Sequence, residues 1–281
     1  MLLAGVARSQ AVIVFGSTES DNLIAPLNGA PWKYVARLDE NNASGVYLGN
    51  GFLLTANHVS VPATALINGG TYLIDSSYAP FQIGGADIKL LRILGDPQLA
   101  PLSLIEPGAT GLNKASTIIG WGVGKGSEVA NQGWNWSDNS SRAERWGSNT
   151  TLSDYYVSNN NQSYLLTSFD RFQGNEEAAV TIGDSGSALF QKFGSQWELA
   201  GITSSVETGG QSLYDHDPLK LLDQPDHNFF IPIALYRDSI LAATAAPLSI
   251  PEPSSRFLLL FGSLGLWFAT ARRRPLARNL S

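Results

Sequence analysis

Residues 181–190 read Thr-Ile-Gly-Asp-Ser-Gly-Ser-Ala-Leu-Phe and place one serine in a glycine-flanked turn just before an apolar strand. Gly183 and Gly186 can adopt positive φ angles and let the backbone approach a ligand closely, which a buried strand alone does not need. The N–H groups of Gly183 and Ser185 can then converge on a developing oxyanion, with Ser185 as the candidate nucleophile. By itself, the stretch is equally compatible with a Gly/Asp/Ser turn between two strands.

The composition around this turn favours an all-β fold. The chain has 281 residues, of which 43% are hydrophobic and 15% charged, so it is long enough for a sizeable core in one large domain or two packed barrels. It also contains 28 glycines, and its apolar runs alternate with turns about every ten residues. Few segments keep a helical period, which favours strands over helices.

Charge and residue types exclude several classes of function. The formal net charge is -6, and basic residues cluster only in the last ten positions, so we expect no nucleic-acid partner. The chain has no cysteine, which excludes disulfides, thiol catalysis and thiolate metal sites. Two histidines lie among aspartates in the polar segment 215–227, but their spacing matches no zinc or EF-hand pattern. We therefore predict no metal and no cofactor.

Two segments upstream of the serine carry the other candidate groups. His58 follows the apolar run 52–55, which a Gly-Asn-Gly turn at residues 49–51 joins to the preceding strand. Asp87 directly precedes the alternating strand 88–93. Taken alone, His58 has an ordinary interpretation as a half-buried polar side chain, and Asp87 as an aspartate at the start of a strand. Their interest is that a carboxylate on a rigid element can orient an imidazole.

Taken in order, these segments resemble a known family. Five segments resemble, in sequence and in order, landmarks of the chymotrypsin family of trypsin-like serine endopeptidases. They are Thr-Ala-Asn-His-Val at residues 55–59, the strand after Asp87, Gly-Trp-Gly at 120–122, Gly-Asp-Ser-Gly-Ser at 183–187 and the strand 197–202. The resemblance covers about residues 32–244. It implies two packed six-stranded antiparallel β-barrels, at about 30–110 and 115–245, in a protease domain at 12–247 that closes with a helix near 235–244.

The resemblance also implies the roles of the site residues. His58 and Asp87 come from the first barrel and Ser185 from the second. Ser185 attacks the scissile carbonyl, His58 transfers the proton and Asp87 orients His58. The N–H groups of Gly183 and Ser185 form the oxyanion hole, and the substrates are proteins or peptides.

The specificity pocket is also inferred from the resemblance. It is expected at residues Ala179, Ser204, Ser205, Val206 and Asn228. Ala179 stands where trypsin has an aspartate, so we expect no preference for Arg or Lys and instead a preference for small or apolar side chains.

The N-terminus has features of a weak or truncated signal peptide at residues 1–11. Ser9 and Ala11 are small residues placed as a signal peptidase requires, although the apolar region is short. Cleavage after Ala11 would liberate Val12, whose ammonium the family would pair with Asp184. The alternative is an N-terminal strand running into residues 12–14.

The C-terminal tail, residues 248–281, contains Pro-Glu-Pro at 251–253, an uncharged apolar run at 257–271 and three arginines at 272–274. A helix over 257–271 would span roughly 22 Å, short of the ~30 Å hydrocarbon core of a bilayer. The arginines place its end in the cytoplasm. This order resembles the PEP-CTERM sorting signal of Gram-negative bacteria. It implies processing by an exosortase-type enzyme, transient membrane anchoring before processing, and export to the cell envelope or surface. A buried terminal helix is the alternative.

The sequence therefore predicts an exported serine endopeptidase that acts through an acyl-enzyme intermediate. The competing hypothesis is a catalytically silent protease-fold binding module on the cell surface, which retention of all three triad residues disfavours. An esterase using the same triad would differ only in substrate. The tryptophan-rich segment 125–151 has nearly balanced charge, and we expect a surface loop packed by its own tryptophans rather than a base-stacking surface.

Overall fold

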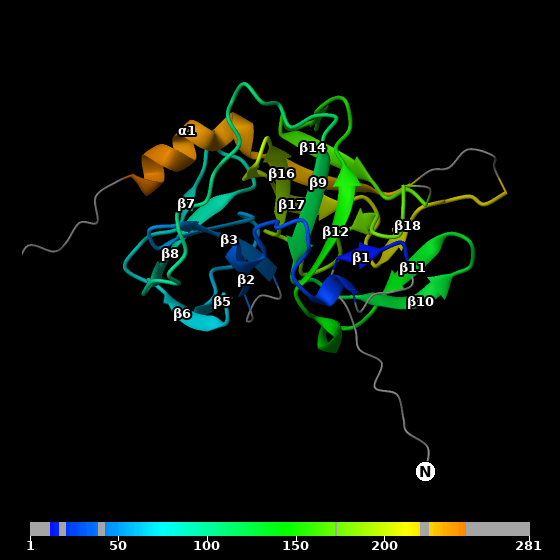
Figure 1. Ribbon diagram of the computed structural model, residues 1–281, viewed down its shortest axis with the longest axis horizontal. Helices are drawn as coiled ribbons and strands as arrows, with labels where there is room; N and C mark the ends of the chain where they lie inside the picture. The colour runs from blue at the N-terminus through cyan, green and yellow to red at the C-terminus, as the bar shows by residue number, and fades with distance from the viewer. Residues whose placement is uncertain (1–11, 17–20, 39–42, 172, 220–224, 246–281) are drawn as a thin grey trace, which may run out of the picture. The chain divides into compact units, whose positions relative to one another are not determined.

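The computed structural model describes residues 12–16, 21–38, 43–171, 173–219 and 225–245. The first half of the chain forms a closed barrel of antiparallel strands (Figure 1). Its strands follow in the order β4-β3-β2-β5-β6-β8, and pairing of β4 with β8 closes the ring, while the short β7 is added at β8. The bounds are β2 (Val35–Leu38), β3 (Ala43–Gly49), β4 (Phe52–Thr55), β5 (Thr64–Ile67), β6 (Gly70–Ile74), β7 (Phe81–Gln82) and β8 (Lys89–Leu94).

The β3–β4 connection forms where the sequence predicts a hairpin. Asn50 and Gly51 have φ angles of 53° and 80°, the left-handed conformations that a tight two-residue turn requires. All residues of β3 and β4 are buried, and they alternate between two cores. Tyr47 and Leu53 point into the barrel, whereas Val46 and Leu54 face the second half of the domain. Successive side chains of a strand point to opposite faces, and both faces of β3 and β4 contact a core, which explains why these strands are apolar on both faces.

The second half forms a seven-stranded antiparallel sheet in the order β12-β9-β16-β17-β19-β14-β13. One bridge, between Thr151 and Thr167, joins the end of β12 to β14. The bounds are β9 (Ala115–Gly120), β12 (Arg145–Thr150), β13 (Tyr156–Val157), β14 (Ser163–Ser168), β16 (Ala188–Phe193), β17 (Gln196–Val206) and β19 (His227–Pro232).

Short elements complete the described part of the domain. The helix α1 (Ile233–Thr244) follows β19. A two-stranded sheet pairs β1 (Ile13–Val14) with β15 (Ala178–Ala179), and a three-stranded sheet contains β10 (Lys125–Val129), β11 (Gly133–Trp136) and β18 (Gln211–Leu213). Three 3-10 turns are described, η1 (Asp21–Leu23), η2 (Trp32–Tyr34) and η4 (Asn139–Ser141).

The segment 125–151 differs from the predicted loop, since it contains the β10–β11 hairpin and the edge strand β12. Its tryptophans also pack on other parts of the chain: Trp134 lies edge-on to Phe15 and Tyr214, and the Trp146 indole N–H donates to the Ile24 carbonyl oxygen. The polar sequence concealed these strands, and β11 and β12 also pair with strands outside the segment, β18 and β9.

The all-β prediction is confirmed, with a closed six-stranded barrel and a helix close to the predicted 235–244. In the described residues the two sides of the second sheet meet at the isolated Thr151–Thr167 bridge and the adjoining Leu152 N–H to Leu166 carbonyl bond, not along a strand ladder, so the second closed barrel stays a prediction. No helix in the described part of the chain is long and apolar enough to cross a membrane. The predicted leader at 1–11 and the apolar helix at 257–271 lie outside the described residues.

Candidate active site

Pairing of β4 with β8 brings the candidate histidine to the candidate aspartate. Thr55, the last residue of β4, pairs with Lys89, the first residue of β8, so the residues just after β4 lie beside those just before β8. The His58 backbone N–H donates to Asp87 Oδ1 at 3.0 Å. Lys89 Nζ donates to the Asn57 carbonyl oxygen at 3.0 Å and steadies the same turn.

The serine turn is tied to the barrel by Ser44 of β3. The Ser44 N–H donates to the Ser185 carbonyl oxygen, and Ser44 Oγ donates to the Gly183 carbonyl oxygen, both at 2.9 Å. Gly183 and Gly186 have φ angles of 92° and 86°, as the turn requires. A Cβ on Gly186 would lie 2.2 Å from the Ser44 carbonyl oxygen, so the barrel and the turn approach too closely for any side chain.

These elements place three predicted residues in one hydrogen-bonded line. His58 Nδ1 lies 2.8 Å from Asp87 Oδ2, and His58 Nε2 lies 2.9 Å from Ser185 Oγ. The His58 side chain is 48% exposed and Asp87 only 23%, so the imidazole is open to a substrate while its carboxylate partner is shielded. A nucleophile, a base and a group that orients the base are thereby within hydrogen-bonding distance, the arrangement that nucleophilic catalysis needs.

Asp87 is held in its charged form. Burial raises the pKa of its carboxyl, but hydrogen bonds from His58 and Ser204 outweigh this, and the pKa is lowered overall. Ser204 Oγ donates to Asp87 Oδ2 at 2.6 Å. A charged Asp87 fixes the Nδ1–H tautomer of His58 and leaves Nε2 as an acceptor for the serine proton.

The turn also presents the predicted anion-binding groups. Among the described residues, no acceptor takes the N–H of Gly183 or of Ser185. Both groups are therefore free to donate to an oxygen that develops charge next to Ser185.

Asp184 lies behind the turn and is completely buried. Burial raises the pKa of its carboxyl to about 6, while the N–H groups of Thr181 and Gly122 and the backbone of Val12 donate to it and lower the pKa. Val12 is itself buried, and the adjoining Ile13–Val14 pairs with β15. The N-terminal segment is thus inserted as a strand beside Asp184.

A cavity of about 230 Å³ opens beside Ser185. Of the five predicted pocket residues, it contains Ser204, Ser205 and Val206. Its other walls come from residues that the sequence did not indicate, Val180, Ile182 and Trp136 among them. Val180 and Ile182 adjoin the serine turn and could have been found from its sequence, whereas nothing in the sequence pointed to Trp136.

The structure places the other two predicted pocket residues outside this cavity. Ala179 pairs with Ile13 and packs in a cluster with Phe169 and Tyr214, because insertion of the N-terminal strand covers that side of β15. Asn228 is completely buried behind the wall, where its Oδ1 accepts the Val180 N–H at 2.9 Å. Asn228 therefore supports the cavity without lining it.

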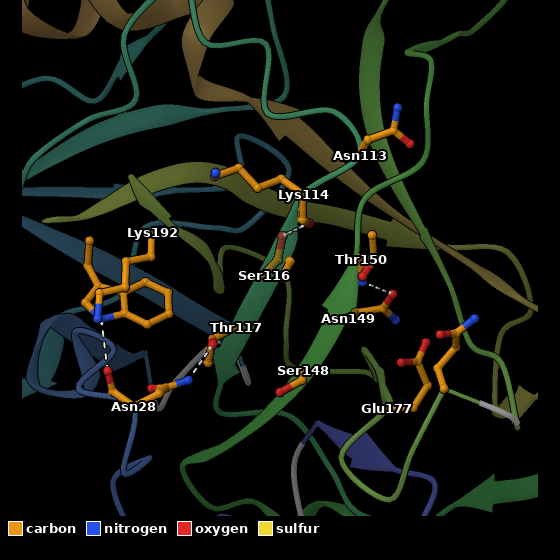
Figure 2. A pocket seen from close by; sticks show the side chains of 13 residues that line it. Asn28, Asn113, Lys114, Ser116, Thr117, Ser148, Asn149, Thr150, Glu177 and Lys192 are labelled. Atoms are coloured by element: carbon orange, nitrogen blue, oxygen red, sulfur yellow. Dashed lines mark hydrogen bonds between the residues drawn. The ribbon is translucent and has the colours of Figure 1, made fainter. Parts of the chain in front are cut away.

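Of the larger cavities, two of about 470 and 420 Å³ adjoin each other beside β12 and do not include the triad. Figure 2 shows the first, which is lined by amide, hydroxyl and lysine side chains, with Glu177 at one side. Burial raises the pKa of Glu177 to about 8. Several lining groups are already paired within the protein, such as Asn28 with Thr117. These cavities hold no paired nucleophile and base, so we do not assign the reaction to them.

The histidines downstream of the serine form separate pairs with carboxylates. His216 Nε2 lies 2.8 Å from Asp226 Oδ1, and His227 Nδ1 lies 2.6 Å from Glu207 Oε2. Among the residues that the structure describes, no three potential metal-binding side chains gather at one point.

Comparison with known proteins gives one family. The family model described as Trypsin matches residues 24–216, more than half of the chain, and the match includes His58, Asp87 and Ser185. No curated protein matches the chain.

Proposed function

The chain belongs to the trypsin family, and we propose that it is a serine endopeptidase that cleaves peptide bonds through His58, Asp87 and Ser185. The observation that carries this proposal is the continuous line from Asp87 through His58 to Ser185, with distances of 2.8 and 2.9 Å. Each distance is within the range in which a proton is shared or transferred.

The reaction proceeds in two halves. Ser185 Oγ attacks the carbonyl carbon of the scissile bond while His58 Nε2 takes the hydroxyl proton. The resulting oxyanion accepts hydrogen bonds from the N–H groups of Gly183 and Ser185, each worth roughly 3 to 4 kcal/mol in such sites. His58 then returns the proton to the leaving amine, which leaves an acyl-enzyme on Ser185. Water, deprotonated by His58, attacks the ester, and His58 returns this proton to Ser185 Oγ as the acid leaves; Asp87 stabilises the imidazolium in both halves.

The test uses a fluorophosphonate probe, which reacts only with an activated serine. We expect labelling of the wild-type protein and complete loss of labelling and peptide cleavage in Ser185→Ala. An inert wild-type protein with a correctly processed N-terminus would contradict the proposal and favour a binding module on the same fold. Cleavage of simple esters but of no peptide would favour the esterase.

The domain is proposed to comprise residues 12–247, with barrels at about 30–110 and 115–245. The bridge from Thr151 to Thr167 supports closure of the second barrel, since it joins the strands at the two sides of that sheet.

Removal of residues 1–11 is proposed to activate the enzyme. A chain beginning at Val12 would carry an ammonium where a backbone N–H now donates to the buried Asp184. The positive charge would favour the ionised carboxyl. N-terminal sequencing of the mature protein tests the idea, and a start elsewhere than Val12 removes it.

The tail at 248–281 is proposed to be a PEP-CTERM sorting signal that anchors the protein in the membrane until an exosortase-type enzyme removes it. Export to the cell envelope or surface of a Gram-negative bacterium follows from this assignment. The support is the order of Pro-Glu-Pro, apolar run and arginines. Intact-mass measurement of surface-extracted protein tests it, and a mature chain that keeps the arginines contradicts it.

The cavity beside Ser185 is proposed to bind the substrate side chain that precedes the scissile bond, with a preference for uncharged small or apolar groups. None of the described residues that line it is acidic or basic. A cation entering it would lose hydration without gaining a partner. Selective cleavage after arginine in a peptide library would overturn this assignment.

A further inference from the structure

Trp136 reaches the cavity beside Ser185 from a part of the chain that precedes the serine turn and belongs to another sheet. We propose that Trp136 is a specificity-determining residue, which makes the cavity select aromatic and large aliphatic side chains over small ones. This inference rests on the proposed peptidase function and narrows the proposed preference from small or apolar side chains to large apolar ones.

Three of the hydroxyl groups around the cavity, those of Thr181, Thr203 and Ser204, are already engaged within the protein. Thr181 Oγ1 donates to the Val123 carbonyl oxygen at 2.7 Å, and Ser204 Oγ donates to Asp87 at 2.6 Å. The hydroxyl of Thr203 pairs with a buried serine hydroxyl. Although these three side chains are polar, their hydroxyl groups are occupied, so they offer a ligand mainly their carbon atoms.

Apart from Ser185 and the exposed Ser205, the remaining walls are apolar. Val180, Ile182 and Val206 contribute aliphatic groups, and Trp136 contributes the one large aromatic surface among the lining residues. A volume of about 230 Å³ exceeds that of engineered cavities of about 150 Å³ that bind benzene, so an aromatic ring fits. Ring-to-ring contact adds to the free energy of burial, whereas a methyl group is too short to reach the far wall.

The indole of Trp136 is held rigidly. Its Nε1–H donates to Ser212 Oγ at 2.9 Å, and its backbone N–H donates to the Gly210 carbonyl oxygen at 2.9 Å. β11, which carries it, lies between β10 and β18 and pairs with both. A side chain fixed in this way loses little freedom when substrate binds, so its contact contributes directly to selectivity.

The experiment compares two peptide substrates that differ only in the residue before the scissile bond, phenylalanine or alanine. In Trp136→Ala we expect the kcat/KM ratio of the phenylalanine to the alanine substrate to fall roughly tenfold. The alanine substrate and the rate of fluorophosphonate labelling should remain within about twofold of wild type, because neither depends on the far wall. Trp146→Ala is the matched control, since its indole binds the Ile24 carbonyl oxygen and does not line the cavity.

Two further variants keep the test decisive if Trp136→Ala fails to fold. Trp136→Phe retains an aromatic wall and should keep most of the ratio, whereas Ser212→Ala frees the indole and should lower it severalfold. If the phenylalanine-to-alanine kcat/KM ratio is unchanged or raised in the Trp136 and Ser212 variants while labelling is intact, the role of Trp136 is wrong but the proposed peptidase function is not affected. A wild-type protein that neither labels nor cleaves overturns both.

Discussion

Glu177→Gln should make the protein more stable, and increasingly so as the pH rises. Glu177 is only 4% exposed, and the contact from the Asp170 N–H to its Oε1 is long, at 3.5 Å. Burial raises the pKa of Glu177 from 4.5 to about 8, and the nearby Asp170 carboxylate acts in the same direction. The folded protein therefore holds a proton on Glu177 across the neutral range.

The sign and size of the effect follow from proton linkage. Below pH 4.5 Glu177 is protonated in both states and costs nothing. Between pH 4.5 and 8 the unfolded chain releases the proton and the folded chain keeps it, so stability falls by up to about 1.4 kcal/mol per pH unit. The uncharged glutamine avoids this loss, and its advantage should grow from about 1 kcal/mol at pH 5 to about 3 kcal/mol at pH 7.

Urea unfolding of wild type and Glu177→Gln, from pH 5 to pH 8, measures this advantage directly. Taking the difference cancels other titrating groups, including Glu144, whose pKa burial also raises to about 8. Glu176→Gln is the matched control because its side chain is exposed and adjoins Glu177 in sequence. Curves for wild type and Glu177→Gln that stay parallel across this range would refute the reasoning.

Two substitutions near the triad should separate folding from catalysis. Gly186→Ala would bring a Cβ to 2.2 Å from the Ser44 carbonyl oxygen at a φ of 86°, so we expect a loss of several kcal/mol of stability, measured by thermal unfolding. An unchanged Tm would contradict this. Ser204→Ala removes a donor to charged Asp87, a bond worth about 1.5–3 kcal/mol, and should lower kcat/KM about tenfold or more while the fold stays intact. Equal activity in Ser204→Ala would show that His58 is oriented without Ser204.

Much of the fold and of the triad could be predicted because the signals are local. The hairpin at Asn50 and Gly51 depends on two residues that tolerate positive φ, and both adopt it. His58 and Asp87 each adjoin a strand with an evident pattern, and the pairing of those strands brings them together. Ser185 is marked by the glycines of its own turn.

The cavity was less predictable because its walls come from distant segments. Ala179 was expected to line it, but insertion of β1 turns that residue toward Ile13, and no pattern around residue 179 reveals this pairing. Trp136 was expected in a loop, and it reaches the cavity only because β11 pairs with β18, far along the chain. Such contacts are set by tertiary packing, which the period of one strand does not encode.

The serine turn also depends on the barrel. His58 and Asp87 belong to the barrel, whereas Ser185 precedes a strand of the second sheet, so their separation of 2.9 Å is set by how the two halves pack. Ser44 fixes that packing through its bonds to the carbonyl oxygens of Gly183 and Ser185. Among the described residues, the N–H groups of Gly183 and Ser185 have no acceptor, so the turn held in this way keeps them available to an oxyanion. One residue of β3 thus holds the turn that carries both the candidate nucleophile and the candidate oxyanion-hole donors.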